Sequence, residues 1–413
     1  METTKAFNFA SGENIVSHNG IRTGHPYVFR EFTYGVLVPS HDHPLVNVSV
    51  ANSSLSIDLW RGCSFQCRYC HVQDSFLDVG VDGKMPSRLM PRSRFSISEI
   101  LDALGEHPFF VKDQTVLSIG TASTEPFASQ ATESTFELME EIVKKGWGNP
   151  IWIVTKAGFP KKMGERLALI TKHNKVMISF CWADNPTTIE PARNDRFANI
   201  EEVKQAGATC AWYMRPMTKD WGANEDHIQK MMNWVVEKKY DRFLDMIVPG
   251  GLRWTPGIEY GLVEVHGLSM PEISHDDNQK DLPEEIWEFI ERKAQDTFPD
   301  IPVFRKSSCA LSHMLGVPDI RSVYASDLHS CTRSSCSNAQ REICSAQPVN
   351  QWNKDSLQEL FNKLSIPAFV QNVSSSRVDS MPSLEKFGNT ITTTVKKMMA
   401  YGPSILSLKN KNF

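Results

Sequence analysis

The chain has 413 residues, 41% of them hydrophobic and 22% charged, a composition typical of globular proteins that bury a full core. No stretch approaches the roughly 18 apolar residues of a membrane span, and the amino terminus lacks the basic-then-apolar order of a signal peptide. We therefore expect a cytoplasmic protein without a membrane segment. A net charge of −4 and a pI of about 6.3 exclude the overall basic field that drives non-specific nucleic-acid binding.

Between residues 55 and 265, short apolar runs alternate with amphipathic helical stretches, the order that builds a parallel sheet or barrel. Strands are expected at 55–59, 115–119, 151–154, 176–180, 210–214 and 243–248, and helices near 98–105, 133–145, 197–205 and 225–238. Ser96 and Glu99 have capping-box spacing before the first of these helices, and Gly146 ends the second. The six strand–helix units predict an α/β fold of the partial (β/α)6 barrel type.

Polar residues follow the predicted strands at the positions where parallel α/β folds bind their ligands. They are Arg61 with the cysteines after it, residues 121–125, Thr155, Lys156, Asp184, Arg215, Gly250 and Gly251. Because the carboxyl ends of parallel strands share one edge of the sheet, these residues are expected to contribute to one site.

The sequence divides into five segments, of which the predicted barrel is the second. Residues 1–50 form an N-terminal extension, residues 51–265 the barrel, residues 266–283 a polar, acidic, proline-containing linker, residues 284–347 a cysteine-rich region and residues 348–413 a C-terminal tail. A helix is expected to start at Pro283, with Asp281 before it and two glutamates in its first turn.

The most informative motif is Cys63-Ser-Phe-Gln-Cys67-Arg-Tyr-Cys70, in which three residues and then two separate the cysteines. This spacing suits a loop around a [4Fe-4S] cluster, because three thiolates bind three irons and leave the fourth open for a ligand. A zinc knuckle is the alternative. Structural zinc normally takes four protein ligands, and the nearest fourth candidate, His71, directly adjoins Cys70 and is poorly placed.

This run resembles the signature of the radical S-adenosylmethionine (SAM) superfamily, in which an aromatic residue, here Tyr69, precedes the last cysteine. The resemblance implies that the open iron binds the amino and carboxylate groups of SAM and that the cluster donates one electron. SAM then cleaves to methionine and a 5′-deoxyadenosyl radical, which takes a hydrogen atom from the substrate. It also implies an electron donor such as flavodoxin or ferredoxin.

Within the superfamily, several runs over residues 55–250 resemble the spore-photoproduct-lyase-like branch. They are Arg61-Gly62-Cys63, Ile119-Gly-Thr-Ala-Ser-Thr-Glu125-Pro126, Val154-Thr-Lys156, Ser179, Glu190-Pro-Ala-Arg193 and Met214-Arg215-Pro216. Carried over by position, the resemblance implies that Glu125 or its neighbouring backbone contacts the SAM amino group, while Lys156 and Ser179 hold the carboxylate and ribose. Arg193 is a second candidate for the carboxylate. For Lys156 and Arg193, a solvated surface charge is the alternative interpretation.

One departure concerns the substrate. Spore photoproduct lyases carry a cysteine near the end of the second strand that returns a hydrogen atom to the product radical, whereas this chain has no cysteine from His71 through Phe180. Together with the acidic pI, this disfavours DNA photoproduct repair.

A second cysteine group, Cys309, Cys331, Cys336 and Cys344, follows the barrel, with intervals of 21, 4 and 7 residues. Four thiolates could fully ligate an auxiliary iron–sulfur cluster, and we expect a second [4Fe-4S] cluster here. Zinc and partly unligated thiols are the alternatives, although no Cys-x-x-Cys pair is present. The position resembles the SPASM and twitch extensions of radical SAM enzymes, but the spacing does not match their usual pattern.

Cys181 and Cys210 are expected to be core residues.

The leading hypothesis is therefore a radical SAM enzyme that abstracts hydrogen from a small molecule or peptide in a biosynthetic pathway. Two other classes stay open: a photolyase-like protein that repairs or modifies nucleic acid, and a metal-binding protein without turnover. Salt-dependent binding to DNA or RNA would favour the first of these alternatives. A lack of SAM cleavage would favour the second.

Overall fold

The structure is a computed structural model. It describes residues 5–7, 14–16, 44–50, 53–60, 62–65, 67–70, 92–105, 107, 110–121, 124–190, 195–253, 258–259, 262–263, 266–271, 282–319, 336–345, 353–363, 368–373 and 378–381. Some residues that the sequence analysis named lie outside the described part of the chain. They are Arg61, His71, Arg193 and Cys331.

A seven-stranded sheet in the order β3-β4-β5-β6-β7-β8-β9 organises the fold. Its strands are β3 (Val48–Val50), β4 (Leu55–Ile57), β5 (Leu117–Ile119), β6 (Ile151–Thr155), β7 (Val176–Cys181), β8 (Thr209–Tyr213) and β9 (Met246–Ile247). β3 pairs antiparallel with β4, and every later neighbouring pair is parallel. The fold is thus mixed α/β with a mostly parallel sheet that does not close, since β3 and β9 end the order.

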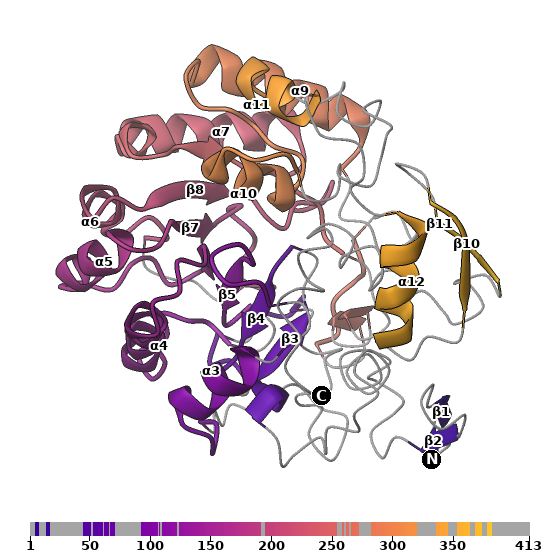
Figure 1. Ribbon diagram of the computed structural model, residues 1–413. Helices are drawn as coiled ribbons and strands as arrows, with labels where there is room; N and C mark the ends of the chain where they lie inside the picture. Colours follow the sequence, from indigo (N-terminus) through magenta and orange to yellow (C-terminus); the bar gives the residue numbers. More distant parts are fainter. Residues whose placement is uncertain are drawn as a thin grey trace.

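Helices connect the parallel strands and follow one another along the outer side of the sheet (Figure 1). They are α3 (Ile97–Gly105), α4 (Thr132–Lys144), α5 (Gly164–Thr171), α6 (Ile200–Gln205) and α7 (Glu225–Glu237). A 3-10 helix, η1 (Pro44–Asn47), precedes β3, and another, η3 (Tyr240–Arg242), precedes β9. This alternation is the connection expected for neighbouring parallel strands.

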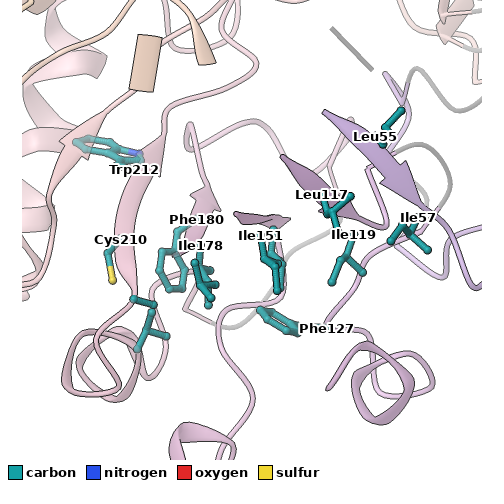
Figure 2. Packing of buried hydrophobic residues seen from close by; sticks show 14 of the residues in the cluster. Leu55, Ile57, Leu117, Ile119, Phe127, Ile151, Ile178, Phe180, Cys210 and Trp212 are labelled. Carbon is teal, nitrogen blue, oxygen red and sulfur yellow. The ribbon is translucent and has the colours of Figure 1, made fainter. Parts of the chain in front are cut away.

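Alternating residues of each central strand enter two different cores, because successive side chains point to opposite faces of a sheet. The outer face packs against the helices through residues such as Ile151, Ile178 and Phe180, and Figure 2 shows this row of side chains crossing the strands. Residues of the inner face, among them Met177 and Tyr213, pack with Phe304 and Leu311 instead. Both faces are buried, as is usual for parallel strands.

The inner face differs from one end of the sheet to the other. Under β4 and β5 it carries hydroxyl groups: Ser54 Oγ lies 2.8 Å from Ser118 Oγ, and Thr121 Oγ1 donates to Ser56 Oγ at 2.7 Å. Under β7, β8 and β9 it is mainly apolar, apart from Ser179, and is covered by α10 (Ser307–Leu315). The inner face thus has a polar half next to the cysteine loop and an apolar half under the C-terminal helices.

The remaining described elements follow the sheet or precede it. They are the hairpin β1 (Lys5–Phe7) and β2 (Asn14–Val16), the helices α9 (Glu284–Thr297), α11 (Asn338–Ser345) and α12 (Lys354–Lys363), and the hairpin β10 (Phe369–Val373) and β11 (Val378–Met381). None of the helices in the described part of the chain has both the length and the apolar composition needed to cross a membrane.

The predicted elements agree with the structure in most places. The capping box is confirmed, because Ser96 N donates to Glu99 Oε2 at 2.7 Å and Glu99 N donates to Ser96 Oγ at 3.2 Å. The helix predicted to start at Pro283 is α9. The last strand starts later than predicted, because residues 240–242 form a 3-10 helix and the Asp245 carboxylate accepts the Cys210 amide at 2.8 Å in place of a ladder carbonyl. β3 and α5 were not predicted, since each is short.

Candidate active site

The cysteines of the first group lie on a loop that follows β4 at the carboxyl edge of the sheet. Gly62, with φ of +78°, begins this loop in the left-handed region that favours glycine. The Cys70 amide donates to the Cys67 carbonyl at 3.1 Å, and the Arg68 amide donates to the Ile189 carbonyl at 2.8 Å. A tight turn therefore carries Cys67 and Cys70 and is fixed to the segment after β7.

Burial differs among the three thiols. Cys67 is buried with Tyr69 in an apolar cluster that includes Ile189 and Trp221, whereas Cys63 and Cys70 are half-buried. Burial raises the pKa of the Cys67 thiol, and the positive charge of nearby Lys156 opposes this rise. The loop thus presents two accessible thiols and one buried thiol beside a cation.

Glu190 is the centre of the polar contacts beside this loop. Its Oε2 accepts hydrogen bonds from the Tyr69 hydroxyl and from Lys156 Nζ, the latter at 3.0 Å, and its Oε1 accepts one from Arg196. Lys156 Nζ also donates to the Tyr69 hydroxyl at 2.6 Å. A buried carboxylate therefore holds two cations and the aromatic residue of the cysteine motif in one group.

This polar group contains two cations and one carboxylate, so its formal charge is positive. Only 5% of the Glu190 side chain and 10% of the Arg196 side chain are exposed, against 18% for Lys156. Burial strengthens the electrostatic interactions of these charges because water screens them poorly. The site is suited to an anionic group that approaches the cysteine loop from the side of Lys156.

Glu125 lies beside this group, at the end of β6. Its carboxylate accepts hydrogen bonds from Thr155 Oγ1 at 2.6 Å, from the Lys156 amide at 2.8 Å and from the Phe127 amide at 3.2 Å. Burial raises the pKa of Glu125 above its ordinary value, and these hydrogen bonds oppose the rise. The carboxylate therefore fixes the backbone that carries Lys156.

The other residues predicted to hold SAM differ in their placement. Ser179 is fully buried on the inner face of β7, and its hydroxyl accepts a hydrogen bond from Trp152 Nε1 at 3.0 Å. Arg193 lies outside the described residues. The structure thus brings Tyr69, Lys156 and Glu125 together. Ser179 lies apart from them, buried on the inner face of β7.

The donor set fits an iron–sulfur cluster. The three thiols stand on one short loop, and the Phe65 amide donates to Cys63 Sγ at 3.4 Å, the kind of amide–sulfur contact that also tunes clusters. Among the described residues, no three cysteine, histidine or acidic side chains converge on a single metal ion. A cluster does not require such convergence, because each thiolate binds a different iron.

The described members of the second cysteine group have different surroundings. Cys309, on α10, and Cys336, just before α11, both pack against the apolar inner-face core. Cys344 is buried on α11, where its sulfur accepts hydrogen bonds from the Asp319 amide and Gln340 Nε2, each at 3.4 Å. Because Cys331 is not described, the four-cysteine site stays a prediction. Cys181 and Cys210 are buried in the sheet, as predicted.

Sequence reasoning missed Glu190 and Arg196 as site residues. It assigned a role to Arg193 and treated Glu190 only as part of a matching run. The sequence contains a signal that could have found them, because two acidic and two basic residues lie within seven positions between a strand and a helix. What the sequence could not show is that Arg196 donates a hydrogen bond to Glu190.

No protein-family model and no curated protein matches this chain. Several solved structures have a similar fold at low identity. A mutant of spore photoproduct lyase is 15% identical, with a TM-score of 0.46 over 62% of this chain and 77% of that one. SuiB from Streptococcus suis, bound to S-adenosylmethionine, is 13% identical, with a TM-score of 0.38 over 76% of this chain and 63% of that one. The anSMEcpe structure with bound AdoMet is also 13% identical, with a TM-score of 0.35 over 86% of this chain and 100% of that one. At these scores the similarities do not determine a function.

Proposed function

We propose that the protein is a radical SAM enzyme that abstracts hydrogen from a small molecule or peptide. The observation that carries this proposal is the position of Cys63, Cys67 and Cys70 on one loop at the carboxyl edge of a mostly parallel sheet, beside the half-buried Lys156 and the buried Glu190. Parallel α/β folds bind their ligands at this edge. The thiol spacing suits a cluster with one open iron.

In this proposal, Cys63, Cys67 and Cys70 hold a [4Fe-4S] cluster, and SAM binds next to it. When bound, the cluster supplies one electron that cleaves SAM into methionine and a 5′-deoxyadenosyl radical. Lys156 is the residue best placed to receive the SAM carboxylate, because its ammonium group is partly exposed and already lies at the end of β6. Glu190 orients Lys156 and Tyr69 through the hydrogen bonds described above.

The further residues have supporting roles in the proposal. Glu125 holds the Lys156 backbone, so that the SAM amino group would meet the neighbouring backbone rather than a carboxylate that already accepts three hydrogen bonds. Ser179 and Arg193 are kept as proposed contacts for the ribose and carboxylate. Cys309, Cys331, Cys336 and Cys344 are proposed to hold a second [4Fe-4S] cluster, and flavodoxin or ferredoxin is the proposed electron donor.

The test is SAM cleavage by the full chain. The protein would be purified without oxygen, reconstituted with iron and sulfide, reduced with dithionite and mixed with SAM. We expect methionine and 5′-deoxyadenosine in equal amounts from the wild type and from Cys210→Ala, which removes a core thiol far along the sheet from the loop. Reconstituted wild-type protein that contains the cluster but yields no 5′-deoxyadenosine would contradict the proposal.

A further inference from the structure

Arg215 is a buried cation that the proposed SAM chemistry does not use. It follows β8 by two residues, and its side chain lies against Tyr213 of the inner face, with the guanidinium carbon 4.3 Å from the ring centroid. Only 9% of the residue is exposed. A guanidinium group in such a place normally has an acidic partner, because an unpaired buried charge is costly.

The partners of Arg215 are neutral. Its Nε and Nη2 donate to the Pro249 carbonyl at 3.3 and 3.1 Å, and its Nη1 donates to the Tyr213 hydroxyl at 3.2 Å. A guanidinium has five N–H groups, so these bonds leave one N–H on each terminal nitrogen. Among the described residues no carboxylate pairs with Arg215, although Arg166, Arg196 and Arg305 each pair with at least one.

Gly250 leaves room for the guanidinium group of Arg215 because it has no side chain. A Cβ atom at Gly250 would lie 2.4 Å from Arg215 Nε, so no larger residue fits there without moving the cation. The Tyr213 hydroxyl, which accepts the Arg215 bond, also bonds to Ser307, the first residue of α10. The positive end of that helix therefore lies on the same side as the cation.

Ser308, the next residue of α10, adds an observation of a different kind. It is 3% exposed, and its hydroxyl has no hydrogen-bond partner among the described residues. The described residues thus include a buried cation without an anion beside Tyr213 and, one position after the Tyr213-bonded Ser307, a buried hydroxyl without a partner. An anion that accepts several hydrogen bonds would satisfy the two N–H groups left on Arg215.

We propose that Arg215 binds the carboxylate or phosphate group of an anionic substrate, at the inner face of the sheet beyond β8. This inference rests on the proposed function, because it places the substrate on the same carboxyl edge as SAM. The SAM carboxylate is assigned to Lys156, at the end of β6. Two strand spacings, about 10 Å along the sheet, separate β6 from β8, and Arg215 therefore serves a second anion.

The test is calorimetric titration of the reconstituted full chain with two probes, malonate for a carboxylate and inorganic phosphate for a phosphate. Arg166→Gln is the matched control, because it removes a guanidinium already paired with Glu133 and Glu140 on the outer helices. We expect one of the two probes to bind the wild type and Arg166→Gln with dissociation constants within twofold. Arg215→Gln should weaken that binding at least tenfold, and Arg215→Lys, which keeps the charge, should weaken it less.

SAM binding and cleavage by the same variants separate this inference from the proposed function. Arg215→Gln should keep the dissociation constant for SAM and substrate-free 5′-deoxyadenosine formation within threefold of the wild type. A loss of SAM binding in Arg215→Gln would overturn the inference, because the anion would then be the SAM carboxylate. Binding of neither probe to the wild type, or equal binding to Arg215→Gln, would also overturn it while leaving SAM cleavage intact.

Discussion

The two cysteine groups of this protein differ in what surrounds their sulfur atoms. The loop at Cys63, Cys67 and Cys70 lies beside Lys156 and Glu190, whose charges act on the buried Cys67 thiol. The described cysteines of the C-terminal group lie instead against an apolar core or accept hydrogen bonds from a backbone amide and an amide side chain. The cysteines of the first group thus lie in a charged site, whereas the described cysteines of the second group lie among helices in mainly apolar surroundings.

The difference indicates a division of roles. A thiolate loop next to partly exposed cations can receive a charged cofactor at an open iron, because the cations stabilise incoming carboxylate groups. A cluster bound by all four C-terminal cysteines, as proposed, would have no open iron, which suits electron transfer or structural support. The following experiments test whether the two groups really have separate functions.

The largest effect is expected for Cys63→Ala, Cys67→Ala and Cys70→Ala combined. Loss of all three thiolates removes the proposed cluster that reduces SAM, so 5′-deoxyadenosine should fall to the level of a reaction without protein. Iron at the C-terminal group should remain. Iron analysis and chromatography of the products would measure both. If the triple variant still formed 5′-deoxyadenosine, the assignment of the loop would be wrong.

The combined Cys331→Ala and Cys336→Ala variant tests the other group. We expect it to lose a second cluster, and with it product formation on the substrate, while SAM cleavage persists, because the ligands of the first cluster are unchanged. Iron and sulfide content with Mössbauer spectra of variant and wild type would show this. Equal iron in both proteins, or stoichiometric zinc in the wild type after anaerobic expression, would leave a single-cluster enzyme.

A smaller effect is expected at Glu190, which distinguishes the charged site from the apolar layer. Glu190→Ala leaves Arg196 buried without this carboxylate and should lower the free energy of unfolding by about 3–5 kcal/mol. Glu133→Ala is the control, because Glu133 forms a mainly exposed pair with Arg166 and should cost about 1 kcal/mol or less. Urea unfolding of both variants measures the difference. Equal losses would show that the Glu190 contacts add nothing beyond a surface ion pair.

The smallest effect is a pH dependence at Glu125. Burial raises the pKa of this carboxyl above its ordinary value of 4.5, so the folded state holds the proton more tightly than the unfolded state. The stability that the protonated group contributes is therefore present below pH 4.5 and is lost as the pH rises from 4.5 to the folded-state pKa. Glu125→Gln should remove this loss.

Urea unfolding between pH 4 and 8 would test this pH dependence. The wild type should lose stability relative to Glu125→Gln as the pH rises above 4.5. Glu137→Gln, which changes a partly exposed carboxylate, is the control and should follow the wild type. A stability difference that changes in the opposite direction with pH would show that the hydrogen bonds from Thr155 and Lys156 outweigh the burial of Glu125.

The sequence by itself determined the local features of this protein. The alternation of short apolar runs and amphipathic stretches predicted the six parallel strands, because side-chain periodicity follows from backbone geometry. The capping box at Ser96 and the start of α9 could also be predicted, since each depends on residues a few positions apart. The spacing of Cys63, Cys67 and Cys70 indicated a cluster for the same reason.

Only the tertiary structure decided which distant residues meet. Glu190 binds Tyr69 across 121 positions of the chain and Lys156 across 34, and no local pattern specifies these contacts. The neutral surroundings of Arg215 likewise depend on Pro249, Gly250 and α10, which come together only when the parallel strands pair. Strand periodicity fixes the face on which a side chain lies, but its partners depend on strand order and on the loops at the carboxyl edge.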